Sequence, residues 1–385
     1  MPEPAAGPLT GLTVIDLTRV LAGPYCTLIL ADLGARVIKI ERPGRGDDAR
    51  QVGPFVEGRS AYFASLNRGK QSLALDLKDE GDREVLLDLL AEADVLVENF
   101  RAGAMERLGL GWADLHARFP RLIYAAASGF GHTGPYADRP AYDMVVQAMG
   151  GIMSLTGEDG GPPTRVGTSI GDLAAGLFTA IGVNTALYHR ERTGEGLKID
   201  VSMLDCQVAL LENAIARYAT TGEVPGPIGA RHPSITPFGS FATADEPLVI
   251  AVGNDALFRT LCLELDRADL GENPDFASNA ERTRHCDALK RELETALATA
   301  PRDTWLDRFH RAGIPCGPLQ NVADVMRDPQ VAARNMIVET TGPQGLRTAG
   351  NPIKLSGFED PVVRPAAPEL DADRPAILGT PDEPN

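Results

Sequence analysis

The sequence predicts an α/β protein whose mostly parallel sheet is covered by helices on both faces. Short apolar runs rich in β-branched residues alternate with stretches of helical apolar spacing along the first half of the chain, which is typical of βαβ units. The composition, 43% hydrophobic and 23% charged, is that of a globular protein. The length of 385 residues fits two domains of roughly 150 residues each, or one large domain with a satellite.

The elements of the first half can be followed in order along the chain. The predicted strands are residues 12–17, 36–41, 72–77, 95–100 and 122–128. The helices expected between them are residues 24–33, 79–93 and 112–119. Two longer helices, 172–192 and 203–219, flank a further strand at 197–202.

A second, smaller unit follows the long helices. Residues 220–237 are dense in Gly and Pro, which predicts a domain boundary or a functional loop. After this loop we expect strands at 238–242 and 248–252, helices at 255–265, 280–298 and 304–311, and a tight connector at 313–318. Beyond residue 319 the chain is predicted to be irregular, with a tail, 366–385, that packs little.

Charge and cysteine usage limit the partners and the compartment. The chain has 37 Lys and Arg against 53 Asp and Glu, a net charge of −16, so nucleic acid and anionic membranes are not expected partners. A polyanionic small molecule is compatible with this charge, because a cleft can be basic inside an acidic shell. No signal peptide is recognised, and no uncharged apolar run approaches the roughly 18 residues of a membrane helix. The five cysteines are widely spread, which predicts reduced thiols in a cytoplasmic protein. The six histidines do not pair at metal-ligand spacing, so no metal site is expected.

One acidic residue stands in an unusual setting. Asp172 follows a run of small residues (GTSIG, 167–171) and opens an Ala- and Gly-rich helix. In one interpretation it is an N-cap that bonds free backbone N–H groups. In the other it is a carboxylate nucleophile, with glycines that let a substrate carbonyl approach and N–H groups that stabilise an oxyanion. The sequence pattern leaves both open.

Several ordered stretches resemble the class III CoA-transferase family, also called the CaiB/BaiF family. They are residues 11–26 (GLTVIDLTRVLAGPYC), 33–42 (LGARVIKIER), 94–109 (DVLVENFRAGAMERLG), 128–135 (SGFGHTGP), 166–176 (VGTSIGDLAAG), 193–205 (TGEGLKIDVSMLD) and 313–318 (GIPCGP). The resemblance implies a Rossmann-like large domain, residues 1–219 completed by 329–385. It also implies a small α+β domain, residues 220–328, with a loop that covers the active site, and a homodimer whose two chains interlock.

The resemblance also implies a function, the transfer of CoA from an acyl-CoA donor to a carboxylic acid. Asp172 falls on the family's catalytic aspartate, which forms a mixed anhydride and then an aspartyl-CoA thioester. The CoA thioester is a substrate, and no permanently bound cofactor is implied.

The positions that match the family's CoA contacts are spread over the first domain. They are Arg19, Val20, Arg42, Lys70, Asn99, Phe100, Arg107 and Tyr142. Arg42 ends a predicted strand, where a guanidinium can bind a phosphate. Asn99 and Phe100 close another strand, at the edge where open α/β sheets bind ligands.

Tyr142 separates two chemistries on this fold. The similar α-methylacyl-CoA racemases carry a histidine at its position, for acid–base movement of the α-proton. Tyrosine, with a reference pKa of about 10, is a poor base at neutral pH. Transfer is therefore favoured, and the alternatives are a 2-methylacyl-CoA racemase or a CoA-binding protein without turnover.

The acceptor acid is less sharply indicated. The similar formyl-CoA:oxalate transferases have a run of glycines in the small-domain loop, and the matching residues 229–233 (GARHP) lack it, so oxalate is less expected. Arg165 or the Arg231–His232 pair could instead meet a second carboxylate, as in succinate, mesaconate or citramalate.

Overall fold

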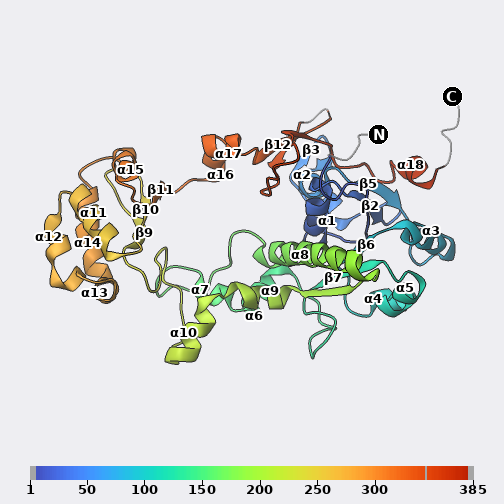
Figure 1. Ribbon diagram of the computed structural model, residues 1–385, viewed down its shortest axis with the longest axis horizontal. Helices are drawn as coiled ribbons and strands as arrows, with labels where there is room; N and C mark the ends of the chain where they lie inside the picture. The colour runs from blue at the N-terminus through green and yellow to red at the C-terminus, as the bar shows by residue number, and fades with distance from the viewer. Residues whose placement is uncertain (1–5, 343–344, 380–385) are drawn as a thin grey trace. The chain divides into compact units, whose positions relative to one another are not determined.

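The computed structural model describes residues 6–342 and 345–379 (Figure 1), and these form two compact units. The first unit takes the described residues within Met1–Met153, Arg165–Glu223 and Pro329–Asn385. The second takes Ser154–Thr164 and Val224–Asp328. The sequence does not predict that residues 154–164 belong to the second unit.

The first unit is built on a parallel sheet, which confirms the predicted α/β class (Figure 1). Its strands, in spatial order, are β5 (Gln71–Ala74), β2 (Arg36–Glu41), β1 (Thr13–Asp16), β6 (Val95–Glu98), β7 (Ile123–Ser128) and β8 (Lys198–Ser202). Numbered along the chain this order is 3-2-1-4-5-6, that of doubly wound sheets, which bind ligands where the order reverses. Here it reverses between β1 and β6, which pair at Val14 and Val95.

Separate apolar cores lie on the two faces of this sheet. On one face α1 (Ala22–Asp32) and α8 (Ile170–Thr193) pack on alternate strand residues such as Val14 and Val37. On the other face α3 (Glu80–Glu92) and α5 (Trp112–Arg118) cover the intervening ones, such as Ile15. Burial on both faces explains why the strands are near-continuous apolar runs.

Shorter elements surround this sheet. They are η1 (Asp48–Gln51), β3 (Phe55–Val56), β4 (Arg59–Ser60), α2 (Ala61–Asn67), α4 (Ala104–Arg107), α6 (Asp143–Met149), α7 (Ile152–Leu155), α9 (Met203–Leu210) and α10 (Asn213–Thr221). The prediction of one helix over 203–219 was wrong. Glu212 has a φ of 52°, a left-handed conformation that interrupts the helix between α9 and α10.

The second unit holds an antiparallel sheet in the order β11 (Cys316–Pro318), β10 (Leu248–Ala251), β9 (Phe238–Phe241). Its helices are α11 (Asp255–Glu264), α12 (Ala268–Glu272), α13 (Asn279–Arg284), α14 (Cys286–Leu297), α15 (Arg302–Arg311) and α16 (Val322–Val325), with η2 (Pro274–Phe276). Two predictions need correction. The helix expected over 280–298 is divided at His285, and the connector at 313–318 ends in a strand.

The chain beyond residue 328 returns to the first unit. It forms α17 (Pro329–Ala333), a small sheet of β12 (Ile337–Thr340), β13 (Arg347–Ala349) and β14 (Val363–Arg364), and α18 (Arg374–Leu378). The prediction of an irregular tail that packs little was wrong for residues 366–379. Asp371 and Asp373 accept hydrogen bonds from the backbone N–H groups of Ala74 and Ser72 on β5, which satisfies an otherwise open sheet edge. Residues 380–385 lie outside the described residues.

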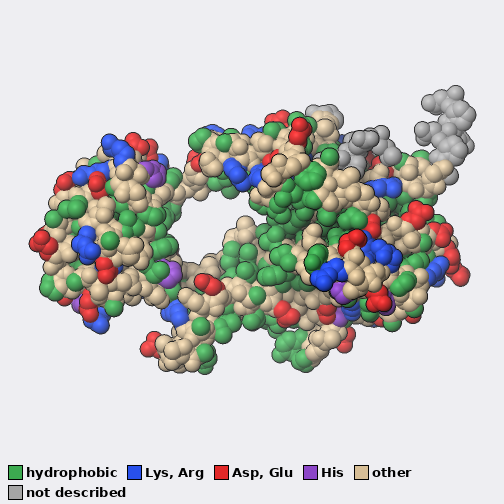
Figure 2. Space-filling view, in the orientation of Figure 1, with side chains coloured by type: hydrophobic (Ala, Val, Ile, Leu, Met, Phe, Trp, Pro, Cys, Tyr) green, Lys and Arg blue, Asp and Glu red, His purple; other side chains and the backbone are tan. Residues whose placement is uncertain are grey.

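Helix α8 is more apolar than the sequence analysis allowed. Among the described residues it is the one helix long and apolar enough to cross a membrane by length and composition, and half of its apolar window is buried in the fold. Its other side exposes Leu177, Ile181 and Tyr188, and Figure 2 shows hydrophobic side chains gathered over this helix. This core helix therefore leaves one apolar face without a partner in the described part of the chain.

Candidate active site

A cleft opens where the strand order reverses, at the carboxyl ends of β1, β2, β5 and β6. Its cavity is about 200 Å³. The floor is apolar, with Leu17, Ile40 and Leu75, and the charged Arg19 and Arg42 also line it. A mostly apolar pocket with a few placed polar groups is the usual form of a small-molecule site.

Three predicted residues meet in this cleft through Asn99. The Asn99 side chain accepts a hydrogen bond from the Arg19 backbone N–H and donates one to the Arg19 carbonyl, both at 2.8 Å. The Arg19 guanidinium lies 5.0 Å from the ring centroid of Phe100, within cation–π range. The Asn99 side chain therefore holds together the turns that follow β1 and β6.

Val20, the residue after Arg19, has a strained backbone conformation. Its φ is 67°, which is rare for a β-branched residue and is typical of functional sites. Its N–H donates to Asp47 Oδ1 at 3.0 Å, and Asp47 forms a fully buried ion pair with Lys39 at 2.9 Å. Burial alone would raise the pKa of the Asp47 carboxyl, but Lys39 holds it below its usual value. A buried pair thus fixes the turn after β1.

The environment of Lys70 argues against the predicted CoA contact. Its ammonium is fully buried and donates to Asp16 at 3.0 Å, and also to Thr27 and Asn67. Burial lowers the pKa of Lys70 to about 8, although Asp16 opposes the shift. Lys78, which the sequence analysis missed, lines the cleft instead. It follows β5, and the carboxyl ends of the strands are where such sheets bind ligands.

Arg107 lies next to this cleft. It ends α4 with an exposed side chain, and the following residue, Leu108, lines the cavity. This position is compatible with the predicted CoA contact.

Asp172 is not the N-cap of α8. The N-cap is Ser169, which makes no side-chain capping bond, and Asp172 is the third helical residue. Within the part of the chain that the structure describes, its carboxylate makes no hydrogen bond or ion pair. Burial, and then the nearby charge of Asp143, raise the pKa of Asp172 to about 7. Of the two interpretations left open by the sequence, the capping one is wrong.

Asp143, which the sequence analysis missed, holds the backbone just before Asp172. Its Oδ1 accepts the Gly171 N–H at 2.8 Å, and its Oδ2 accepts from Gln147 at 2.7 Å. A Cβ on Gly171 would lie 2.7 Å from a methyl carbon of Val146 on α6. Gly171 therefore allows close packing between α8 and α6.

Two tyrosines belong to this neighbourhood. Tyr142 directly precedes Asp143 and is 78% exposed. Tyr62 on α2, which was not predicted as a site residue, lies close enough to three carboxylates for their charges to change its pKa. Burial raises the pKa of Tyr62 to about 12, and Asp172, Asp47 and Asp143 add to the shift. The charge of Asp172 and the charge of Asp47, which lines the cleft, therefore both act on Tyr62.

The arginines proposed for the acid fall in different units. Arg165 belongs to the first unit, and its Nη2 is 3.9 Å from Asp143 Oδ2. Arg231 belongs to the second unit, where it pairs with Asp159 at 2.7 Å and Asp287 at 3.5 Å. His232 accepts the Ser234 N–H within its own turn. Arg165 is thus the only one of these three side chains that the structure groups with Asp143.

Comparison with known proteins fits this arrangement. A family model described as CoA-transferase family III matches residues 9–374. The chain belongs to CoA-transferase family III. It is 52% identical to an acetyl-CoA:oxalate CoA-transferase of Acetobacter aceti, over 98% of this chain and 96% of that protein. It is 42% identical to a succinyl-CoA:mesaconate CoA-transferase of Haloarcula hispanica, over 97% and 96%. A crystal structure of a CAIB/BAIF family protein from Brucella suis matches with a TM-score of 0.85 and 41% identity, over 97% of this chain and 99% of that one. The chain is therefore an enzyme, a CoA-transferase.

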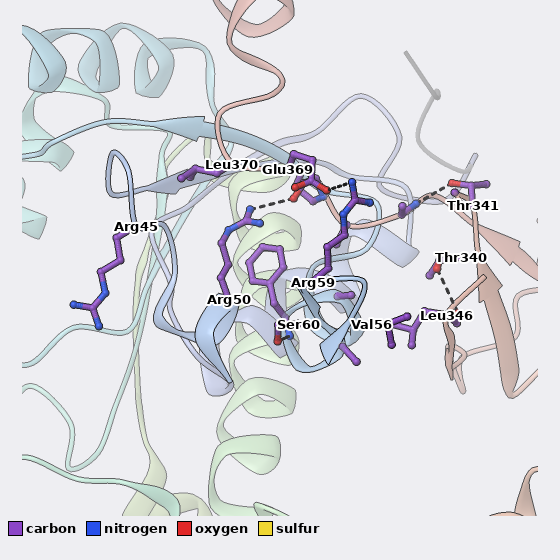
Figure 3. A pocket seen from close by; sticks show the side chains of 18 of the residues that line it. Arg45, Arg50, Val56, Arg59, Ser60, Thr340, Thr341, Leu346, Glu369 and Leu370 are labelled. Atoms are coloured by element: carbon purple, nitrogen blue, oxygen red, sulfur yellow. Dashed lines mark hydrogen bonds and ion pairs between the residues drawn. The ribbon is translucent and has the colours of Figure 1, made fainter. Parts of the chain in front are cut away.

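A second cavity in the first unit of this CoA-transferase is lined by different groups (Figure 3). It measures about 320 Å³ and lies between α2 and the C-terminal stretch near Glu369. Arg50 is held there by both carboxylate oxygens of Glu41, and Arg59 pairs with Glu369. Because the first cleft lies at the carboxyl ends of the strands where their order reverses, it remains the candidate site for acyl-CoA.

Proposed function

We propose that this enzyme transfers CoA from an acyl-CoA donor to a small dicarboxylate, with Asp172 as the covalent nucleophile. The observation that carries the proposal is the setting of Asp172. Its carboxylate lies at the start of α8 without a bonding partner among the described residues, and Asp143 holds the backbone N–H of Gly171 just before it. A pKa of about 7 leaves much of it ionised at neutral pH, and an ionised carboxylate can attack a thioester.

The steps balance without a proton donor. The Asp172 carboxylate attacks the thioester carbonyl, and the C–S bond breaks to give a mixed anhydride and CoA thiolate. The thiolate attacks the Asp172 carbonyl carbon, and the donor acid leaves as a carboxylate. The acceptor carboxylate then attacks the resulting aspartyl-CoA thioester, and the released thiolate attacks the acceptor's acyl carbon. This frees Asp172 and the new acyl-CoA. Covalent catalysis here divides one difficult exchange into easier ones.

The relatives and Arg165 support a dicarboxylate acceptor. The two relatives are named for oxalate and mesaconate, which are both dicarboxylates. Arg165 is 40% exposed beside Asp143, and a guanidinium suits a second carboxylate. Oxalate was not expected because the small-domain loop lacks a run of glycines. The 52% identical relative is named for oxalate, so the missing glycines are no longer an argument against this acid. Oxalate therefore belongs among the candidate acceptors.

A product assay tests this function. The full-length protein is incubated with acetyl-CoA or succinyl-CoA together with one acid at a time, namely oxalate, mesaconate, citramalate or glutarate. In a second incubation it is given a 2-methylacyl-CoA in D₂O without any acid. New CoA esters are then read by mass. We expect a new ester that requires one of the acids. Deuterium at the α-carbon of a 2-methylacyl-CoA without any acid would instead indicate a racemase, and CoA binding without product a protein that only binds.

Neutralising Arg42 is expected to weaken acyl-CoA binding. Arg42→Gln should raise the KM for the acyl-CoA donor about tenfold and leave kcat within about twofold, because a charge-assisted contact to phosphate is lost in both the ground state and the transition state. Steady-state kinetics measure both constants. Arg327→Gln, which breaks a surface ion pair in the second unit, is the matched control. An unchanged KM in Arg42→Gln would contradict this assignment.

The apolar face of α8 supports a homodimer. Leu177, Ile181 and Tyr188 line a groove of about 530 Å³ with Tyr25 and Ile29 of α1. An apolar groove of this kind on a globular protein is typical of an interface. Light scattering should give about twice the chain mass of 41.0 kDa, and a monomer would contradict the proposal. The interlocked arrangement of the two chains rests on the family resemblance alone.

A further inference from the structure

One carboxylate gathers three guanidinium groups at the rim of the cleft. Asp48 pairs with Arg42 at 2.7 Å, and with Arg19 and Arg45 at 3.6 Å each. Arg19 and Arg42 line the cleft. Neither Asp48 nor Arg45 was singled out by the sequence. Arg45 lines the second cavity (Figure 3). All four side chains are between 38% and 60% exposed, so the cluster is open to a group that extends beyond the edge of the cleft.

The backbone that presents Asp48 is fixed by buried contacts. Asp48 begins η1, and the residue before it, Asp47, caps that turn by accepting the Ala49 N–H. Asp47 is itself held by Lys39 and by the Val20 N–H. Because these anchors do not depend on the ion pairs at the surface, Asp48 keeps its place when its partners move.

The charges of the cluster do not balance. The three guanidinium groups and one carboxylate sum to a net charge of about +2. Among the described residues, no other carboxylate forms a salt bridge with Arg19, Arg42 or Arg45. Without Asp48 these like charges repel one another, and solvent-exposed arginines gain freedom by separating. The Asp48 carboxylate therefore preorganises a cationic site, and about two negative charges from a ligand would neutralise it.

A phosphate monoester supplies that charge, since it carries about −1.5 to −2 at neutral pH. CoA has one such group, on its ribose 3′ position, whereas each phosphate of its diphosphate bridge carries a single charge. We propose that Asp48 is a positioning residue that gathers the three arginines into a site for one phosphomonoester, which makes the enzyme prefer CoA over 3′-dephospho-CoA. This inference rests on the proposed function, because it takes the cleft as the CoA site.

The opposite role for Asp48 predicts an opposite result. If Asp48 only competed with the ligand as an anion, its removal would raise the positive charge and strengthen the preference for the dianionic ligand. If it positions the arginines, its removal lets them separate and weakens that preference. The ratio of the two dissociation constants, for 3′-dephospho-CoA and for CoA, therefore distinguishes the roles.

The experiment measures this ratio by titration calorimetry on the full-length protein. We expect the wild type to bind CoA about tenfold tighter than 3′-dephospho-CoA, and Asp48→Asn to lower this ratio about fivefold. Asp48→Glu should keep most of this ratio. Arg45→Gln should lower the ratio while Asp48 itself is unchanged. Asp324→Asn is the matched control, because Asp324 is 39% exposed and pairs with Arg327 at 2.9 Å.

Equal affinity of the wild type for the two ligands would overturn the proposal, as would a ratio that is unchanged or raised in Asp48→Asn. If Asp48→Asn does not fold, Asp48→Ala, which removes the same carboxylate, gives the same decision. Failure of the proposed function is seen separately, as an absence of any new CoA ester in the wild-type product assay.

Discussion

Asp172→Asn is expected to lower the kcat of CoA transfer by at least about 10³-fold. The amide has nearly the same shape as the carboxylate, but it is a poor nucleophile and cannot form the anhydride. The carboxylate makes no hydrogen bond within the described part of the chain, so its replacement breaks no contact seen there. Removing a half-buried charge whose pKa is raised should also not destabilise the fold. Initial rates of new acyl-CoA formation measure the effect.

CoA binding separates this loss from misfolding. The cleft residues Arg19 and Arg42 follow β1 and β2, whereas Asp172 is on α8, so the dissociation constant of Asp172→Asn for CoA should stay within about threefold of the wild type. Exposed Asp205, in the first turn of α9, provides the control variant Asp205→Asn, which should keep full activity. Full transfer activity in Asp172→Asn would show that another group is the nucleophile.

Asp143→Asn is expected to change both the rate and its pH dependence. In the wild type, kcat/KM should rise with pH up to about 7 and then level off, because burial, and then Asp143, raise the pKa of Asp172 and only the ionised carboxylate attacks. Without the charge of Asp143 this midpoint should move to lower pH. The kcat should fall about 10- to 100-fold, because an amide cannot accept from both Gly171 and Gln147 as the carboxylate does.

The pH–rate profile is the readout that a purely structural role would not move. A fall in kcat with an unchanged midpoint would mean that Asp143 supports the helix without acting on the charge of Asp172. The same profile for Asp205→Asn should match the wild type. Both variants lose one carboxylate in the first turn of a helix, so they change the net charge equally. A difference between their pH–rate profiles therefore comes from the position of Asp143 and not from the net charge.

The strands were predictable because the sheet is buried on both faces. Strands such as β7 are fully buried and read as continuous apolar runs, and the helices between them show their own period. The break between α9 and α10 was not predictable, because the left-handed residue there is Glu212 rather than a glycine. The small sheet of β12 to β14 was missed because β13 and β14 have only three and two residues, too few to show a period.

The site was predictable where strand ends carry it. Asn99 follows β6 and meets Arg19 at the reversal of the strand order. The same rule favours Lys78, which follows β5, over Lys70, which precedes it. Asp143 and Tyr62 had no such signal. Their proximity to Asp172 comes from contacts across 28 residues or more of chain, and no local pattern encodes them.

Trapping the covalent intermediate tests the role of Asp172 most directly. Trypsin cuts after Arg165 and Arg190, and the peptide 166–190 contains Asp172 as its only Asp or Glu. The enzyme is incubated with an acyl-CoA donor, treated with hydroxylamine, digested and analysed by mass spectrometry. An activated carboxyl on Asp172, as anhydride or thioester, should convert to a hydroxamate on this peptide and only when the donor is present. An unmodified 166–190 peptide from an enzyme that is turning over, or a hydroxamate on any other peptide, would contradict Asp172 as the nucleophile.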